Sequence, residues 1–315
     1  MRRLAVLAFA AACGGAAPAP TPPPPTSNLA AGTTLRLPLM RTRVNNTDLH
    51  FRLAGDSTAT PVVFVHGSTG NLDNWSNQLG AFVAKHRVVV YSRRYHPPNA
   101  ARDDGQVYTP GLHAEDLAAL IEGLNLGPAH IVGSSYGAFV AIDLALERPD
   151  LVRSLVLGEP PILPFLLRTP EGDSLRRVFE SRALDPARAA FRRGDSVEAM
   201  RRFVDGVGGA GRFDNLVPAA RDLLLRAAFE LRRELQADPR EYMPALACND
   251  LGRLATPILL LKGDRSPRMF HLITDQLERC LNTETVTIVP GAGHAIHSSN
   301  PSYYNQVVLQ YLASH

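Results

Sequence analysis

The sequence predicts an α/β fold: a mostly parallel central sheet with helices on both faces and a helical cap inserted between two strands. Short, wholly apolar segments alternate with helical patterns along most of the chain. Strands of this kind belong to sheets that are buried on both faces. One long stretch, about residues 161–246, has helical periodicity and no convincing strand. The alternation therefore predicts the sheet, and its interruption predicts the cap.

The expected elements follow one another in a regular order. The strands are expected at residues 35–44, 49–53, 61–65, 87–91, 130–132, 154–157, 257–261 and 285–289. The helices are expected at residues 73–85, 113–124, 136–147, 274–281 and 302–312. Strands that are separated by helices usually pair in parallel, so the carboxyl ends of most strands should meet at one edge of the sheet.

Composition and charge narrow the class of partner. Of the 315 residues, 45% are hydrophobic and 20% are charged, as in ordinary globular proteins. The formal charge is 33 − 30 = +3, and Arg2 and Arg3 supply two of the positive charges. Nucleic-acid binding needs a concentrated basic face, so this balance argues against such a partner. Between Arg168 and Arg240, 15 arginines accompany 12 acids, which predicts a self-paired, solvated cap surface.

The first 33 residues have the pattern of an export signal followed by a spacer. Residues 1–12 have a basic head and a nine-residue apolar run, which fits a signal peptide. The run ends in Ala10-Ala11-Ala12-Cys13, which resembles a bacterial lipobox, whose cysteine is lipidated. Residues 13–33 add a Pro-rich spacer before the domain at 34–315. We expect an exported cell-envelope protein that is anchored through Cys13, or otherwise periplasmic or secreted.

Export would also decide the state of the cysteines, because disulfides persist in oxidising compartments. If Cys13 carries lipid, Cys248 and Cys280 remain as an even pair. A disulfide and two separate buried thiols both remain open, because the sequence does not determine the distance between them. Neither of the two has another cysteine or a histidine at metal-ligand spacing, so no metal site is expected.

The segment Gly133-Ser134-Ser135-Tyr136-Gly137 has the G-x-S-x-G pattern of a nucleophile elbow. It lies between an expected strand and an expected helix, which is the context that this pattern requires. Glycines two residues before and after the central serine remove the Cβ atoms that would clash in so sharp a turn. The pattern predicts Ser135 as a nucleophile at the carboxyl end of the sheet.

Two other expected strands end in small residues beside a histidine. His66-Gly67-Ser68-Thr69-Gly70 can direct backbone N–H groups toward Ser135, unless it is a plain glycine loop. The N–H groups of Ser68 and Tyr136 are the candidates for an oxyanion hole. Gly291-Ala292-Gly293-His294 predicts His294 as the general base. His297 is expected to be a supporting or surface residue.

These three motifs and their order resemble the α/β-hydrolase family, in its form with a helical cap. The resemblance covers about residues 35–315. It implies that nucleophile, acid and histidine follow one another along the chain. It also implies a small-molecule substrate and no cofactor. A serine nucleophile argues against dehalogenase or epoxide hydrolase chemistry, for which the family uses aspartate at this position.

Two carboxylates compete for the role of the acid. In the commonest family pattern, Gly-acid-x-Asp-Pro, the usual aspartate position of Gly263-Asp264-Arg265-Ser266-Pro267 holds a serine. Asp264 stands two residues earlier. In a variant pattern the acid follows the preceding strand, where Glu159 stands before two prolines. We expect Glu159 to be the acid, with Asp264 as the alternative.

The expected activity is hydrolysis of esters of small or medium apolar acids through an acyl-enzyme. Hydrolysis of C–C or amide bonds, and ligand binding without catalysis, are the alternatives. The run from Gly206 to Gly211 formally matches the dinucleotide pattern G-x-G-x-x-G. No strand precedes this run, so we expect a loop or hinge between cap helices instead of a nucleotide site.

Overall fold

The computed structural model describes residues 37–281 and 286–315. The contacts divide the chain into the segment 1–33 and the domain 34–315. The predicted signal peptide, Cys13 and the spacer lie outside the described residues, so export and lipid attachment stay predictions. None of the described helices is long and apolar enough to cross a membrane.

An eight-stranded sheet runs through the domain in the order β1-β2-β4-β3-β5-β6-β7-β8. Its strands are β1 (Met40–Val44), β2 (Thr47–Ala54), β3 (Pro61–Val65), β4 (Arg87–Tyr91), β5 (Ala129–Ser134), β6 (Val152–Gly158), β7 (Ile258–Gly263) and β8 (Val286–Val289). The first two strands form an antiparallel hairpin, and β2 is antiparallel to β4. All other neighbours are parallel. The predicted mostly parallel sheet is confirmed.

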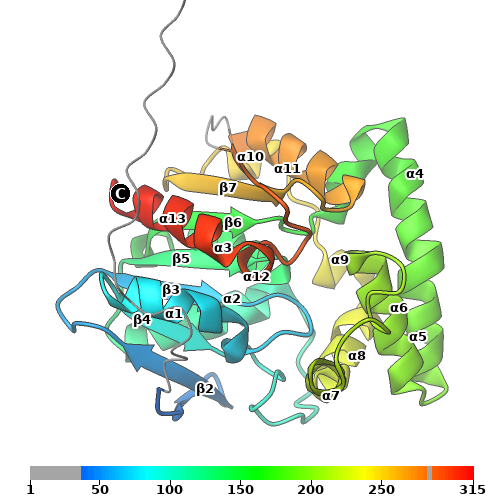
Figure 1. Cartoon of the computed structure of the whole chain (residues 1–315), viewed down its shortest axis with the longest axis horizontal. Coiled ribbons are helices and arrows are strands. Elements are labelled where there is room, and N and C mark those ends of the chain that lie inside the picture. The colour runs from blue at the N-terminus through cyan, green and yellow to red at the C-terminus, as the bar shows by residue number, and fades with distance from the viewer. Residues whose placement is uncertain (1–36, 282–285) are drawn as a thin grey trace, which may run out of the picture. The chain divides into compact units, whose positions relative to one another are not determined.

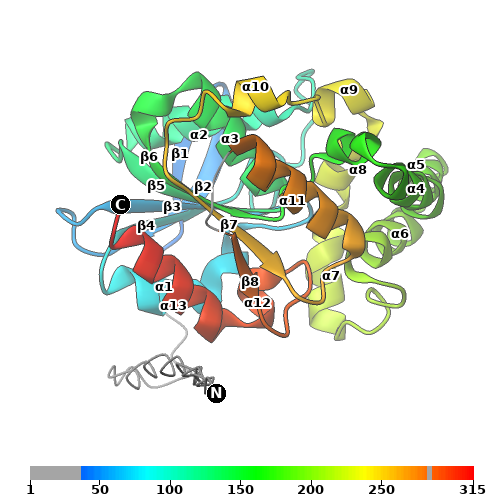
Figure 2. The same ribbon diagram turned by 90° about the horizontal axis from the view of Figure 1, so that it is seen from above.

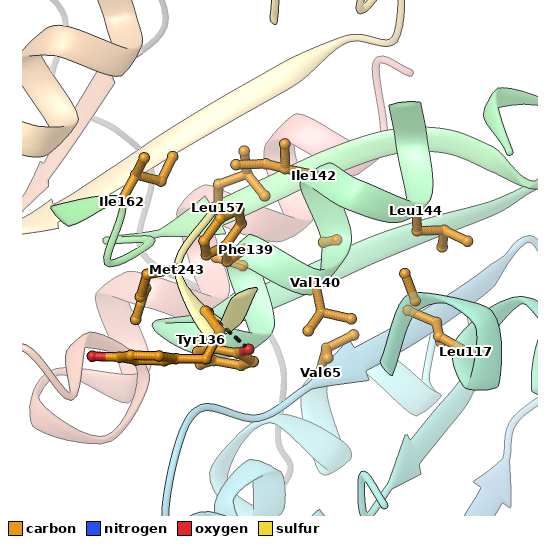
Figure 3. Packing of buried hydrophobic residues seen from close by; sticks show 14 of the residues in the cluster. Val65, Leu117, Tyr136, Phe139, Val140, Ile142, Leu144, Leu157, Ile162 and Met243 are labelled. Atoms are coloured by element: carbon orange, nitrogen blue, oxygen red, sulfur yellow. Dashed lines mark hydrogen bonds between the residues drawn. The ribbon is translucent and has the colours of Figure 1, made fainter. Parts of the chain in front are cut away.

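Helices cover both faces of this sheet (Figure 1 and Figure 2). One face carries the 3-10 turn η1 (Leu72–Trp75) with α1 (Ser76–Val83), α12 (Ile296–Ser299) and α13 (Pro301–Leu312). The other carries α2 (Pro110–Gly123), α3 (Tyr136–Glu147) and α11 (Arg268–Leu281). On this second face, Phe139 and Val140 of α3 pack among Val65, Leu117 and Leu157 (Figure 3). Each face thus has its own apolar core.

Between β6 and β7 the chain forms only helices. They are η3 (Leu163–Arg168), α4 (Pro170–Phe179), the π-helix η4 (Glu180–Leu184), α5 (Asp185–Arg192), α6 (Ser196–Gly208), α7 (Pro218–Arg226), α8 (Ala228–Gln236), α9 (Pro239–Tyr242) and α10 (Cys248–Leu251). Those from α4 to α9 lie at the end of the sheet to which the parallel strands point (Figure 1). The predicted cap is therefore confirmed.

Several expected boundaries were wrong by a few residues. The first strand begins at Met40 and not at residue 35, since Pro38 has no N–H to offer a ladder. Helix α11 begins directly after Pro267, six residues before its expected start at residue 274. Gly206 and Gly208 still belong to α6, so the expected cap loop begins only at Gly209, which has φ 97°.

Cys248 and Cys280 form a disulfide across 32 residues, which decides between the two alternatives left open by the sequence. The bond joins α10, at the end of the cap, to α11. Among the described residues, no cluster of three or more histidine, cysteine or acidic side chains is arranged to hold a metal ion.

Candidate active site

Ser135 occupies the sharp turn between β5 and α3, with φ 53° and ψ −124°. Few non-glycine residues adopt such a conformation, and it persists only where the surroundings enforce it. The flanking glycines permit the turn. A Cβ on Gly133 would lie 2.5 Å from the Cα of Ala138, and one on Gly137 would lie 2.2 Å from the carbonyl oxygen of Val65. The turn projects Ser135 from the carboxyl end of the sheet.

His294 lies in the loop after β8 and reaches Ser135 across the sheet edge. Its Nε2 is 2.9 Å from Ser135 Oγ. The imidazole stacks on the ring of Phe270, with the ring centroids 3.8 Å apart and the planes inclined by 14°. Phe270 belongs to the first turn of α11, a turn that the sequence patterns did not reveal. The stacking holds the imidazole in one orientation.

Glu159 follows β6 directly and completes a hydrogen-bonded chain. Its Oε2 lies 2.6 Å from His294 Nδ1, and its Oε1 accepts the Gly263 N–H at 2.9 Å. The side chain is fully buried, and the backbone of Glu159 has φ 46°. The structure therefore brings together the three predicted residues, each from a loop that follows a different parallel strand.

Asp264, the alternative acid, has another role. Its side chain is exposed and accepts the Ala292 N–H at 3.0 Å. Hydrogen bonds from the backbone of Gly291 and Ala292 lower the pKa of this carboxyl. Asp264 thus stabilises the turn that leads to His294, while Glu159 occupies the place beside the imidazole.

The predicted oxyanion residues are Ser68 in the loop after β3 and Tyr136 at the start of α3. The segment 66–70, here called the β3 loop, passes so close that a Cβ on Gly67 would be 2.9 Å from Ser135 Cβ. Ser68 in this loop lines the same cavity as Ser135. Tyr136 is the first residue of α3, so its N–H lies at the positive end of the helix dipole. Ser68 and Tyr136 therefore remain the candidates for the oxyanion hole.

The cavity above Ser135 is small, with a volume of about 30 Å³, and is largely apolar. Core and cap both contribute to its wall, which includes Pro161, Leu163, Phe179, Leu184, Phe203, Val207, Leu235, Met243, Met269 and Phe270. Phe179 and Met269 also line a larger, charged outer cavity, so the two cavities adjoin. The apolar lining suits an apolar part of a ligand.

Two acidic residues of the cap are not solvated as expected. Glu230 and Glu234 of α8 are buried, although the charge pattern predicted a solvated cap surface. Glu234 is the one acidic or basic side chain among the described residues that line the Ser135 cavity. In the sequence, the one indication that Glu230 and Glu234 act together is their spacing, because helical residues four apart lie on the same face.

His297 is not a surface residue. It is buried in α12, and its ring lies 4.3 Å from the Trp75 ring, measured between centroids. Burial, with a smaller contribution from His294, lowers the pKa of His297 to about 4. Of the two expected positions, the surface position is wrong, and a supporting role for His297 stays a prediction.

Comparison with known proteins agrees with this fold. The model of the alpha/beta hydrolase family matches residues 62–307, so the chain belongs to this family and is a hydrolase. Among its relatives, the sn-1-specific diacylglycerol lipase ABHD11 of Mus musculus is 27% identical over 277 residues, 83% of each chain. A non-heme chloroperoxidase of Streptomyces lividans is 27% identical over 293 residues, which cover 87% of this chain and 99% of the relative.

Solved structures show the same architecture. The carboxylesterase CesB of Bacillus subtilis superposes with a TM-score of 0.69 over 89% of this chain and 93% of its own, at 17% identity. At this level of identity the match shows the fold alone.

Proposed function

We propose that the protein is a serine carboxylic-ester hydrolase in which Ser135, His294 and Glu159 form the catalytic triad. The observation that carries this proposal is the continuous hydrogen-bonded chain from Ser135 Oγ through the imidazole to Glu159. Nucleophile, base and orienting acid in this arrangement are the parts that acyl transfer requires.

The proposed reaction has two steps. His294 Nε2 removes the Ser135 proton as Oγ attacks the ester carbonyl, and His294 then protonates the departing alcohol. Water, activated by the same imidazole, hydrolyses the acyl-enzyme. Glu159 holds the Nδ1–H and offsets the charge that the imidazole gains. The N–H groups of Ser68 and Tyr136 stabilise the oxyanion, and each donor contributes about 10²–10³-fold in rate.

The cavity supports the choice of substrate. Its apolar wall suits an acyl or alkyl group of small or medium size. The adjoining outer cavity, with Arg182 and Arg268 in its lining, offers a polar path for the remainder of the substrate. The lipase and esterase named among the similar proteins are consistent with ester chemistry, whereas amide or C–C hydrolysis is the alternative for the same residues.

A fluorophosphonate probe tests the proposal, because it forms a covalent bond only with an activated serine. The full chain should be labelled and should hydrolyse a panel of p-nitrophenyl esters. Ser135→Ala should abolish both the labelling and the ester hydrolysis. Ser134 is the neighbouring serine at the end of β5, and Ser134→Ala should retain both. A folded wild-type protein that is neither labelled nor active on esters would favour ligand binding without catalysis.

We also propose export and lipid anchoring through Cys13, on the sequence pattern alone. Cells that are fed radioactive palmitate should label the wild-type protein in the membrane fraction, and Cys13→Ser should remove the label. Retention of the label in Cys13→Ser would exclude this anchor.

A further inference from the structure

The β3 loop is held from two sides. The core holds its ends, because ring nitrogens of His66 and His96 lie 2.9 Å and 2.8 Å from the carbonyl oxygens of Gly67 and Gly70. The middle of the loop, Ser68 and Thr69, instead meets helix α8 of the cap. The loop that approaches Ser135 therefore depends on a cap helix for part of its restraint.

Glu230 binds the loop backbone directly. Its Oε2 accepts the Thr69 N–H at 3.2 Å. Its Oε1 accepts the Tyr108 hydroxyl at 2.5 Å and lies 3.2 Å from His96 Nε2. Despite complete burial, the contacts with His96, Arg93 and Tyr108 lower the pKa of Glu230, which favours its ionised form. Several donors around one buried carboxylate define its position closely.

The residue that Glu230 holds has a strained backbone. Thr69 has φ 59°, in the left-handed region that β-branched residues rarely adopt. Such a conformation costs on the order of 1–3 kcal/mol and needs support from neighbouring groups. The hydrogen bond to Glu230 is support of this kind, and it comes from outside the loop.

Glu234 lies one turn further along α8, on the same face, and acts on the preceding loop residue. Glu234 and Ser68 line the cavity that contains Ser135, and the Ser68 side chain partly offsets the rise in the pKa of Glu234. Burial and the neighbouring Glu230 carboxylate raise the pKa of Glu234 well above its usual value. The raised pKa favours the protonated, neutral form of Glu234.

We propose that Glu230 and Glu234 are positioning residues for the oxyanion hole. Helix α8 sets the direction of the Ser68 N–H, so the hole is complete only when α8 lies against the β3 loop. This inference rests on the proposed function, in which the Ser68 amide binds the oxyanion. It assigns to two cap residues an effect on the transition state.

Three variants separate hydrogen bonding from bulk and charge. Glu234→Gln resembles the protonated acid and should keep kcat within about threefold. Glu234→Leu has a similar volume but no polar group to offer Ser68, so kcat should fall about 10- to 100-fold with little change in KM. Glu230→Gln should lower kcat to a similar extent, because it removes the charge beside Arg93. Glu241→Gln, an exposed cap variant, should match the wild type.

Inhibitors distinguish positioning from general damage to the cap. A trifluoromethyl ketone forms a tetrahedral adduct with an oxyanion, whereas the matching methyl ketone binds mainly as an intact carbonyl. In Glu234→Leu the affinity for the first should fall in parallel with kcat/KM, and the affinity for the second should stay unchanged. Equal losses for both ketones, or a wild-type kcat in this variant, would overturn the proposal.

Amide hydrogen exchange tests the same inference without turnover. Exchange in residues 66–70 should be faster in Glu234→Leu and in Glu230→Gln than in the wild type, while α2 and α3 should be unaffected. Unchanged exchange in both variants would overturn the positioning role. A protein that lacks esterase activity but shows the exchange effect would contradict the proposed function and leave the role of α8 supported.

Discussion

Glu159 and His294 are 135 residues apart in the chain, yet Glu159 Oε2 lies 2.6 Å from His294 Nδ1. The contact arises because β6 and β7 are adjacent parallel strands and β7 is followed in the sheet by β8. Both side chains therefore emerge at the same edge. The second carboxylate oxygen bonds to Gly263 at the end of β7, which orients the acid toward the imidazole.

This relationship predicts the effect of neutralising the acid. Glu159→Gln should lower kcat by about 10³–10⁴, because the amide no longer stabilises the tautomer and the charge that His294 requires. Asp264→Asn should change kcat little, since Asp264 binds only the turn backbone. Steady-state kinetics on one p-nitrophenyl ester measures both effects. The reverse ranking would show that Asp264 is the acid.

The sequence predicted the sheet, the cap and three of the residues that meet at its edge, because each follows an apolar strand and bears a local signature. Glycine at positions 133 and 137 predicts the turn at Ser135, and the prolines after Glu159 predict a chain exit there. Such signals are short in range. Parallel pairing then brings the strand ends together.

Contacts between the cap and the core could not be predicted in this way. Glu230 and Glu234 lie in a stretch rich in charges, where burial depends on the position of α8 against the β3 loop. The stacking of Phe270 on His294 likewise depends on where α11 begins. These contacts depend on tertiary packing, for which a single sequence has no local signature.

The close approach of the β3 loop predicts that Gly67→Ala strongly reduces the activity. The new Cβ would lie 2.9 Å from Ser135 Cβ and 3.0 Å from the Ser134 carbonyl oxygen, so the loop must move. A misplacement of this size should reduce kcat/KM about 100-fold. Gly80→Ala is the control, because no atom lies within 4 Å of its added Cβ in α1. Normal labelling and kinetics in Gly67→Ala would contradict the expected contact.

Burial of His297 predicts that stability falls with acidification. Its pKa is about 4 in the folded protein and about 6.5 in an unfolded chain. Between these values the unfolded chain binds the extra proton, so stability is fully present above about pH 6.5 and is lost as the pH falls toward 4. Between pH 7.5 and 5.0 the loss from this group is roughly 2 kcal/mol.

Urea unfolding at the two pH values measures this contribution. His297→Phe keeps a ring against Trp75 but cannot be protonated, so its free energy of unfolding should depend less on pH than that of the wild type. Some dependence should remain, because burial also lowers the pKa of His130 to about 4. An identical pH dependence in variant and wild type would refute the assignment to His297.

The disulfide predicts a further contribution to stability. Cys248 and Cys280 are 32 residues apart in the chain. A cross-link over such a distance typically adds about 2–4 kcal/mol to the free energy of unfolding. Replacement of both cysteines by serine should lower the free energy of unfolding by that amount. Activity at 25 °C should remain, because Ile273 and Leu277 still anchor α11 in the core and Phe270 stays against His294.

Alkylation before and after reduction, followed by peptide mapping, tests the bond itself. In the native chain the peptides that contain Cys248 and Cys280 should be unmodified and linked, and after reduction each should carry one alkyl group. Under oxidising conditions the midpoint urea concentration for unfolding should be lower for the double serine variant than for the wild type. When the wild type is reduced, the two midpoints should be equal. Free thiols in the native protein, or equal stability under both conditions, would show that the packing of α10 on α11 does not depend on this link.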